Sequence, residues 1–278
     1  MEYTLGNTLL KVENVSLEVP GNGFGKTKRL IHDINIEEKD VIRPGMQQGQ
    51  MIAIVGDSGR GKSTLFKVLS GLVKPTTGYV HIPGEKGQGR NVHEGDVGFV
   101  DQKYTLFRSD TIYKALMFAA EKGGVASKDR HDVVMKYIVD WKLEEAKDNF
   151  PNQCSGGQRQ RAAAIQQLLC SKHFIIMDEP FSGLSVRGIR NLKEIMNLTC
   201  QADELNTILF AAHDLNLAVE MADQIYVIGY PKDENGNLIK SGTIVASYDL
   251  KQMGLAWMPF GLDHIDLVKK IGDDFINS

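Results

Sequence analysis

Hydrophobic and polar residues alternate over positions 8–43, a pattern that predicts extended strands with one buried face. The turn-forming residues Gly21, Asn22 and Gly23 divide this alternating stretch into two runs. Two runs joined by so short a turn are expected to pair antiparallel. We therefore predict an antiparallel β subdomain in the first part of the chain.

Short apolar runs of the kind found in buried strands recur along the rest of the chain, with helical patterns between them. These runs occupy residues 51–55, 97–100, 174–177, 207–211 and 225–228. Strands that alternate with helices predict an α/β fold with a mixed or parallel sheet. In such a fold the groups that bind ligands stand at the ends of the strands.

The stretch of about residues 105–169 differs, because its apolar residues recur at helical spacing. Two helical faces are predicted, one from Ile112, Ala115, Leu116 and Ala119 and another from Val133, Val134, Tyr137 and Ile138. We assign this stretch to a separate helical lobe within a domain of residues 1–242.

Residues 243–278 are expected to form a C-terminal extension to this domain. Apolar residues recur in it at a spacing of three, which predicts a short amphipathic helix. The predicted apolar face comprises Leu262, Ile265, Val268 and Ile271. The pair Asn235-Gly236 lies shortly before the extension and favours a hairpin turn.

The composition excludes several classes of protein. Charged residues make up 24% and hydrophobic residues 42% of the 278 positions, an ordinary globular mixture. The formal charge of -3 provides no general attraction to nucleic acid or anionic lipid. No apolar run approaches the roughly 20 residues that span a bilayer, and the first residues do not resemble a signal peptide. We expect a cytoplasmic protein without a nucleic-acid partner, whose contact with a membrane passes through another protein.

The most informative motif directly follows the apolar run at 51–55. Residues 56–63 read GDSGRGKS and match G-x-x-x-x-G-K-[ST], the pattern of a phosphate-binding loop. The glycines let successive backbone N–H groups point into one concavity, the lysine reaches the β- and γ-phosphates, and the serine hydroxyl takes a magnesium position. The predicted nucleotide-binding residues are Gly56, Asp57, Ser58, Gly59, Arg60, Gly61, Lys62, Ser63 and Thr64.

Apolar residues then recur at helical spacing, at Leu65, Val68, Leu69, Leu72 and Val73. A helix that begins at the loop directs the positive end of its dipole at the phosphates. A glycine-rich surface turn without a ligand can match the same short pattern. The strand before the loop and the helix after it favour nucleotide binding over that alternative.

Two carboxylates, Asp178 and Glu179, end the apolar run at 174–177. Successive side chains on a strand point in opposite directions, so these two acids cannot serve the same role. Asp178 is placed to hold magnesium, directly or through water, and Glu179 to polarise an attacking water as a general base. The alternative is that the two acids merely end a strand, and the phosphate-binding loop earlier in the chain disfavours it.

A further motif comprises Ser155, Gly156, Gly157 and Gln158, which precede a helical run. Serine followed by glutamine three residues later forms a capping box, so one interpretation is a well-capped helix start. The two glycines weaken that interpretation, because they lower helix propensity and expose backbone N–H groups at the positive end of a helix. Such a terminus suits a second phosphate-binding surface.

With these motifs the chain resembles the ATP-binding cassette (ABC) ATPases over nearly all its length. The motif at 155–158 is similar to the family signature, residues 99–102 resemble its glutamine loop, and residues 179–184 resemble the strand end that runs into its dimer-contact loop. His213, at the end of the run at 207–211, resembles its switch histidine. The resemblance implies a P-loop NTPase core with a β subdomain and a helical signature lobe.

The resemblance also implies the chemistry. Two such domains, as a homodimer or as a heterodimer with a second ABC ATPase, enclose two ATP molecules, and Ser155 and Gly157 of one domain grip the γ-phosphate held by the other. In this arrangement Mg²⁺ is held by Ser63, Gln102 and Asp178. The implied catalytic residues are Lys62 on the phosphates, Glu179 on the water, His213 on the γ-phosphate, and Gln102.

The chain departs from the family pattern in several places. Val19 stands where an aromatic residue stacks on adenine, and Phe24 is a nearby candidate for that contact. Ser185 replaces the usual aspartate of the dimer-contact loop, and Cys154 replaces the leucine before the signature. None of these departures removes a catalytic residue, so we predict a competent ATPase.

The resemblance favours the ATPase subunit of a transporter, docked at the inner face of the cell membrane on a separate permease, as in bacterial importers. Export remains open, and the transported substrate is chosen by other subunits. The alternative is an ABC ATPase without a transport role that acts in a soluble assembly complex of the cluster-assembly type. The sequence between the loop and the signature holds no coiled-coil heptads, which excludes chromosome-type members.

Overall fold

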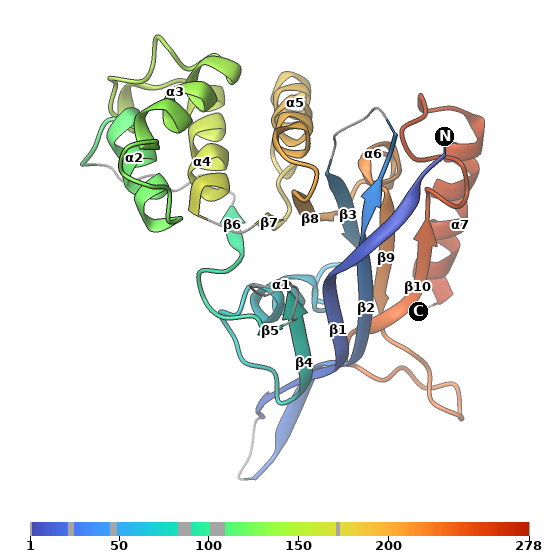
Figure 1. Ribbon diagram of the computed structural model, residues 1–278. Coiled ribbons are helices and arrows are strands. Elements are labelled where there is room, and N and C mark those ends of the chain that lie inside the picture. Colours follow the sequence, from blue (N-terminus) through green and yellow to red (C-terminus); the bar gives the residue numbers. More distant parts are fainter. Residues whose placement is uncertain are drawn as a thin grey trace.

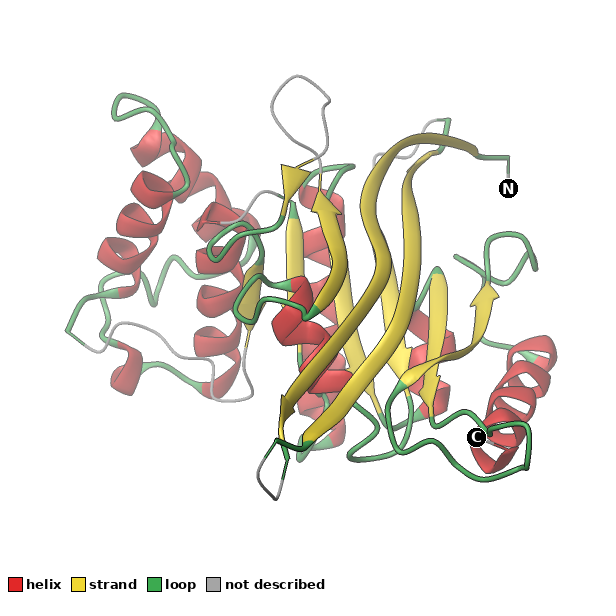
Figure 2. Cartoon of the chain, turned by 90° about the horizontal axis from the view of Figure 1, so that it is seen from below, coloured by secondary structure: helices red, strands yellow, loops and turns green. Residues whose placement is uncertain are grey.

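The computed structural model describes residues 2–21, 25–44, 49–82, 90–100, 109–170 and 173–277. Two sheets lie at the centre, and a lobe of helices stands to one side of them (Figure 1). This lobe and the C-terminal helix lie at opposite ends of the molecule in both views (Figure 2). Among the described residues no helix is long and apolar enough to cross a membrane.

The first sheet is antiparallel and has the order β2-β1-β4-β5. It consists of β1 (Thr4–Pro20), β2 (Thr27–Ile42), β4 (Thr77–Ile82) and β5 (Arg90–Asn91). Strands β1 and β2 are the two predicted runs, and their pairing confirms the predicted antiparallel subdomain. Their inward side chains, among them Val15, Ile31 and Ile34, are fully buried.

The second sheet has the order β10-β9-β3-β8-β7-β6. Its strands are β3 (Gln50–Val55), β6 (Gly98–Val100), β7 (Phe174–Met177), β8 (Thr207–Ala212), β9 (Gln224–Gly229) and β10 (Thr243–Asp249). All neighbours pair in parallel except β10, which runs antiparallel to β9. Every residue of β3, β8 and β9 is buried, as expected for a sheet covered on both faces. The predicted mixed sheet is confirmed.

Three helices build the lobe around an apolar core of their own. They are α2 (Ile112–Lys122), α3 (Arg130–Asp140) and α4 (Gly156–Cys170), with a 3₁₀ turn at Pro151–Gln153. The four residues of the first predicted face are buried, and Val134 and Ile138 of the second face are also buried. Cys154 lies in the same core, so this smaller residue still packs where the family has leucine.

The remaining helices flank the second sheet and its loops. They are α1 (Lys62–Leu69), α5 (Val186–Ala202), α6 (Leu215–Met221) and α7 (Leu262–Asn277). Helix α1 ends earlier than the spacing predicts, and Leu72 is exposed. Gly71 explains this end, because it adopts the left-handed backbone conformation (φ 73°) that terminates helices.

The apolar face predicted for the C-terminal helix is partly wrong. Leu262 and Ile265 are exposed, whereas His264, Leu267 and Ile271 are buried. A constant spacing of three drifts by about 60° per step around a helix of 3.6 residues per turn, so the four predicted residues cannot share one buried stripe. The buried residues follow the spacing of three, then four, that keeps to one face.

The segment expected as an extension begins with a strand of the central sheet, because β10 starts at Thr243. Leu250, Leu267 and Ile271 belong to the same apolar core as strands β3, β8 and β9. The segment therefore helps to bury one face of the sheet that carries the phosphate-binding loop.

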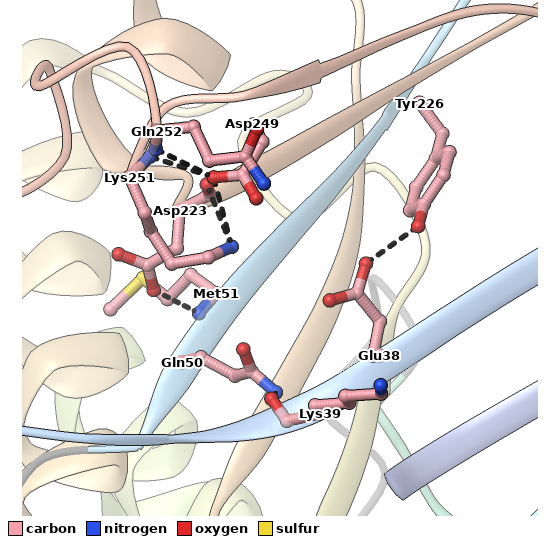
Figure 3. A network of polar contacts seen from close by, with 9 residues as sticks. All are labelled: Glu38, Lys39, Gln50, Met51, Asp223, Tyr226, Asp249, Lys251 and Gln252. Atoms are coloured by element: carbon pink, nitrogen blue, oxygen red, sulfur yellow. Dashed lines mark hydrogen bonds and ion pairs between the residues drawn. The ribbon is translucent and has the colours of Figure 1, made fainter. Parts of the chain in front are cut away.

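Buried polar side chains join the two sheets (Figure 3). The hydroxyl of Tyr226 in β9 donates a hydrogen bond of 2.7 Å to Glu38 in β2, which is 5% exposed. The side chain of Gln50, at the start of β3, donates to the backbone carbonyl of Lys39 at 3.1 Å. Burial raises the pKa of Glu38 from 4.5 to about 7, although the Tyr226 hydrogen bond and the charge of Lys251 oppose the rise.

Replacing Glu38 with glutamine is expected to flatten the dependence of stability on pH. Between pH 4.5 and about 7 the folded protein holds a proton on Glu38 that the unfolded chain releases. Stability therefore falls as pH rises through this window, by up to about 3 kcal/mol, and stays low above it. Glu38→Gln can still accept from Tyr226, and Asp223, Asp249 and Lys251 nearby are unchanged.

Urea unfolding of both proteins at pH 5, 6, 7 and 8 measures this effect. The variant should gain stability over the wild type as pH rises. A stability difference that does not change between pH 5 and 8 contradicts the prediction.

Candidate functional site

The phosphate-binding loop connects the buried strand β3 to helix α1, as the sequence predicts. Gly59 and Gly61 have φ values of 79° and 110°, which side chains rarely adopt. At Gly56 there is no room for a side chain, because a Cβ atom there would lie 2.3 Å from the carbonyl oxygen of Ile228 in β9. The glycines therefore fold the loop tightly over the ends of the central strands.

Lys62 is buried under this loop and 4% exposed. Its Nζ donates hydrogen bonds to the carbonyl oxygens of Gly56, at 2.7 Å, and Asp57, at 3.1 Å. It also lies 4.0 Å from Oε1 of Glu179. Burial lowers the pKa of Lys62, and the charges of Glu179, Asp178 and Asp57 counter this effect. The lysine thus bonds back to its own loop and forms an ion pair with Glu179.

Glu179 and His213 meet at the ends of neighbouring strands β7 and β8. Nε2 of His213 and Oε1 of Glu179 are 2.6 Å apart, and both side chains are partly exposed. Glu179 has a positive φ of 50°, an uncommon conformation for a non-glycine residue that often marks functional positions. Asp214 caps helix α6 by accepting from the N–H groups of Asn216 and Leu217, which fixes the chain directly after His213.

Asp178 follows β7 and carries a buried oxygen, Oδ1, that has no hydrogen-bond partner among the described residues. A buried carboxylate oxygen without a partner is costly unless a ligand satisfies it. Ser63 lies in the first turn of α1. No group of three or more acidic, histidine or cysteine side chains that could hold a metal occurs in the described part of the chain. Asp178 and Ser63 together suit Mg²⁺, which is usually bound by one or two protein oxygens together with phosphates and water.

The signature residues form the predicted capping box at the start of α4. The N–H of Ser155 donates to Oε1 of Gln158 at 2.8 Å, and the N–H of Gln158 donates to Oγ of Ser155 at 3.3 Å. A Cβ atom added at Gly156 would meet nothing within 4 Å among the described atoms. No hydrogen bond or ion pair among those of the described chain joins this motif to the phosphate-binding loop.

The structure thus brings together Lys62, Glu179 and His213 and places the signature residues elsewhere. Val19 is partly buried in β1, where it pairs with Lys28 of β2. Ser185 caps helix α5 by accepting from the N–H of Gly188 at 3.2 Å. Gln102 and Phe24 lie outside the described residues.

One residue of the site is missed by the sequence reasoning. Tyr230 follows β9 and donates from its hydroxyl to the carbonyl oxygen of Gly59 at 3.1 Å. Its ring lies 4.2 Å from the guanidinium carbon of Arg60. A tyrosine two residues after the apolar run at 225–228 was the available signal, because strand ends carry ligand groups in this fold class.

A family model described as ABC transporter matches residues 40–182. The chain is 33% identical over 230 residues to the sulfate/thiosulfate import ATP-binding protein CysA of Mesostigma viride, covering 80% of this chain and 62% of that protein. It is 31% identical over 232 residues to a probable CysA of Chlorella vulgaris, covering 84% of this chain and 90% of the relative.

Solved structures share the fold at lower identity. The chain is similar to cbiO1 from Clostridium perfringens, with a TM-score of 0.68, 21% identity and coverage of 90% and 92% of the two chains. It is also similar to the ATP-binding cassette MJ0796 in a dimeric post-hydrolysis state with ADP and Pi, with a TM-score of 0.62, 22% identity and coverage of 87% and 99%. The family match over half of the chain, together with the curated relatives, shows that the chain belongs to the ABC transporter family and carries its ATP-binding domain.

Proposed function

We propose that this chain hydrolyses ATP and thereby energises a separate transmembrane permease. The observation that carries the proposal is the convergence of Lys62, Glu179 and His213 at the mouth of the phosphate-binding loop. At this position the lysine provides a ligand for phosphate and the carboxylate provides a base for the attacking water. The imidazole orients that carboxylate.

In the proposed reaction Glu179 accepts a proton from the water that attacks the γ-phosphate. His213 holds the carboxylate through Nε2 and also faces the γ-phosphate. Lys62 and the loop N–H groups neutralise the charge that spreads over the phosphate oxygens. Asp178, Ser63 and Gln102 would hold Mg²⁺, which supplies charge neutralisation of the β- and γ-phosphates when bound.

The site is completed by a second subunit, identical or related, that presents its Ser155, Gly156 and Gly157 to the γ-phosphate. The open space at Gly156 supports this arrangement, because nothing in the described chain requires a glycine there and a ligand could approach its backbone. MJ0796 is described as a dimer with ADP and Pi. Loss of the γ-phosphate would remove the link between the subunits and allow the dimer to open.

The partner is a permease in the membrane, so the chain is placed at the inner face of the membrane as a peripheral subunit. The names of the curated relatives support import of a substrate, and those relatives import sulfate or thiosulfate. The first of them is longer, and this chain spans 62% of its length. The permease and its other subunits determine which compound is imported.

Purification of the tagged chain from detergent-solubilised membranes tests the partner. We expect an integral membrane protein with several membrane spans to co-purify, and the chain to leave the membrane at alkaline pH, as a peripheral subunit does. A complex that contains only soluble proteins would contradict the transport role and favour the cluster-assembly alternative. An untagged strain processed in parallel identifies proteins that bind the resin by themselves.

A further inference from the structure

Arg60 and Tyr230 form a stacked pair at one edge of the phosphate-binding loop. The guanidinium carbon of Arg60 lies 4.2 Å from the centre of the Tyr230 ring. The Tyr230 hydroxyl is anchored on the carbonyl oxygen of Gly59 at 3.1 Å. Nη2 of Arg60 also lies 3.4 Å from Oδ2 of Asp57. The Tyr230 ring thus fixes the plane of the Arg60 guanidinium at the edge of the loop, and Asp57 adds only a weak contact.

The order of the strands shows which end of the site this pair occupies. Strand β3, which carries the loop, lies between β8 and β9. Glu179 and His213 follow β7 and β8, so the γ-phosphate belongs on that side of the loop. Tyr230 follows β9 and lies on the opposite side. A triphosphate whose γ end meets Glu179 must therefore direct its ribose and base toward the β9 side.

Other contacts close this side of the loop with backbone rather than with an aromatic side chain. The N–H of Gly242 donates to the carbonyl of Leu30 in β2 at 2.9 Å, and the N–H of His32 donates to the carbonyl of Gly242 at 2.9 Å. The aliphatic side chain of Val19, on the strand paired with β2, presents no aromatic face. His32 also carries a planar ring here, but its Nδ1 is hydrogen-bonded to Oγ of Ser241 at 3.0 Å. Arg60 and Tyr230 are the stacked planar pair that contacts the loop itself.

The chemistry of the pair suits a purine. A guanidinium is planar and remains charged, and it stacks on aromatic faces. The Arg60 side chain is 18% exposed, so part of it remains accessible from solvent. Its contact with Asp57, whose side chain is 58% exposed, is long and contributes little, so a ligand can displace it at small cost.

We propose that Arg60, braced on Tyr230, binds the base of the nucleotide and replaces the aromatic contact that Val19 does not make. Arg60 stacks on the purine, and Tyr230 is a positioning residue that fixes the plane of the guanidinium. The inference rests on the proposed function only in taking ATP as the ligand. It concerns binding and does not depend on hydrolysis or on a permease.

Comparison of ATP with inorganic tripolyphosphate, which has no base, tests this inference by titration calorimetry with Mg²⁺. Arg60→Ala and Tyr230→Leu should each weaken ATP binding about tenfold, the loss typical of one stacking contact. Neither should weaken tripolyphosphate binding by more than about twofold, because Lys62 and the loop N–H groups hold the phosphates. Tyr230→Phe keeps the ring and should restore most of the affinity that Tyr230→Leu loses.

Phe118→Leu is the matched control, because Phe118 also lies beneath a cation, Lys122, but belongs to the helical lobe. Arg60→Lys keeps the positive charge but not the planar guanidinium, so its ATP affinity should fall as it does in Arg60→Ala. It tests the stacking contact even if Arg60→Ala does not fold. An equal loss of ATP and tripolyphosphate binding would assign the pair to the phosphates or to loop structure and overturn the proposal. Unchanged ATP binding in both variants would also overturn it. Failure of the wild type to hydrolyse ATP would count against the proposed function alone.

Discussion

Glu179→Gln should reduce ATP hydrolysis about 100-fold or more while ATP binding persists, because the amide cannot accept a proton from the attacking water. The carboxylate oxygen of Glu179 lies 2.6 Å from Nε2 of His213 and 4.0 Å from Nζ of Lys62, and the amide preserves the shape of this arrangement. With hydrolysis blocked, the ATP-bound dimer should accumulate. Phosphate release measures the rate, and size-exclusion chromatography with ATP and Mg²⁺ measures the dimer.

Glu204→Gln provides the matched control, because Glu204 is an exposed glutamate before β8 and makes no contribution to the site. It should hydrolyse ATP at the wild-type rate and show no additional dimer. Undiminished hydrolysis in Glu179→Gln would remove Glu179 from the role of general base. If the dimer formed equally well with ADP, its closure would not depend on the γ-phosphate.

Gly242→Ala should abolish most nucleotide binding although the residue lies outside the loop. A Cβ atom at this position would lie 2.0 Å from the carbonyl oxygen of Arg60 and 3.2 Å from Cδ1 of Ile228. The glycine cannot retreat easily, because its N–H and carbonyl are both hydrogen-bonded to β2, at Leu30 and His32. The loop must therefore shift. We expect ATP and tripolyphosphate binding to fall together by at least about tenfold, with a loss of stability of roughly 1–3 kcal/mol.

Gly272→Ala is the control for this change, because a Cβ atom at Gly272 in α7 meets no described atom within 4 Å. It should bind both ligands as the wild type does. Calorimetry and urea unfolding measure the two effects. Wild-type affinity for tripolyphosphate in Gly242→Ala would show that the loop tolerates the displacement, contrary to this prediction.

The elements that were predicted correctly are those whose pattern is local. Strands β3, β8 and β9 are buried on both faces, so each appears as an uninterrupted apolar run. The loop glycines and the capping box of Ser155 and Gln158 are defined by residue type at fixed spacing. The role of His213 was implied only by the family resemblance, and its contact with Glu179 agrees with the rule that parallel strands end at one edge of a sheet.

The features that were not predicted depend on contacts between distant parts of the chain. The buried face of α7 is a partial exception, because a spacing of three, then four, marks it locally, yet it includes the polar residue His264, whose Nε2 bonds to the carbonyl of Leu255. In the sequence, strand β10 looks like part of a C-terminal extension, because its pairing with β9 is not visible there. Tyr230 and Arg60 are 170 positions apart in the sequence (230 − 60), so no local pattern encodes their contact.

The hydrogen bonds of Lys62 bear on how tightly the loop binds a nucleotide. Its amine bonds to the carbonyl oxygens of Gly56 and Asp57, so an arriving phosphate competes with the loop itself for this cation. When the phosphate departs, these carbonyls take the amine back, and no buried charge is left without a partner. Since ATP and ADP must both compete with these two carbonyl oxygens for the amine, we expect the loop itself to lower the affinity for either nucleotide.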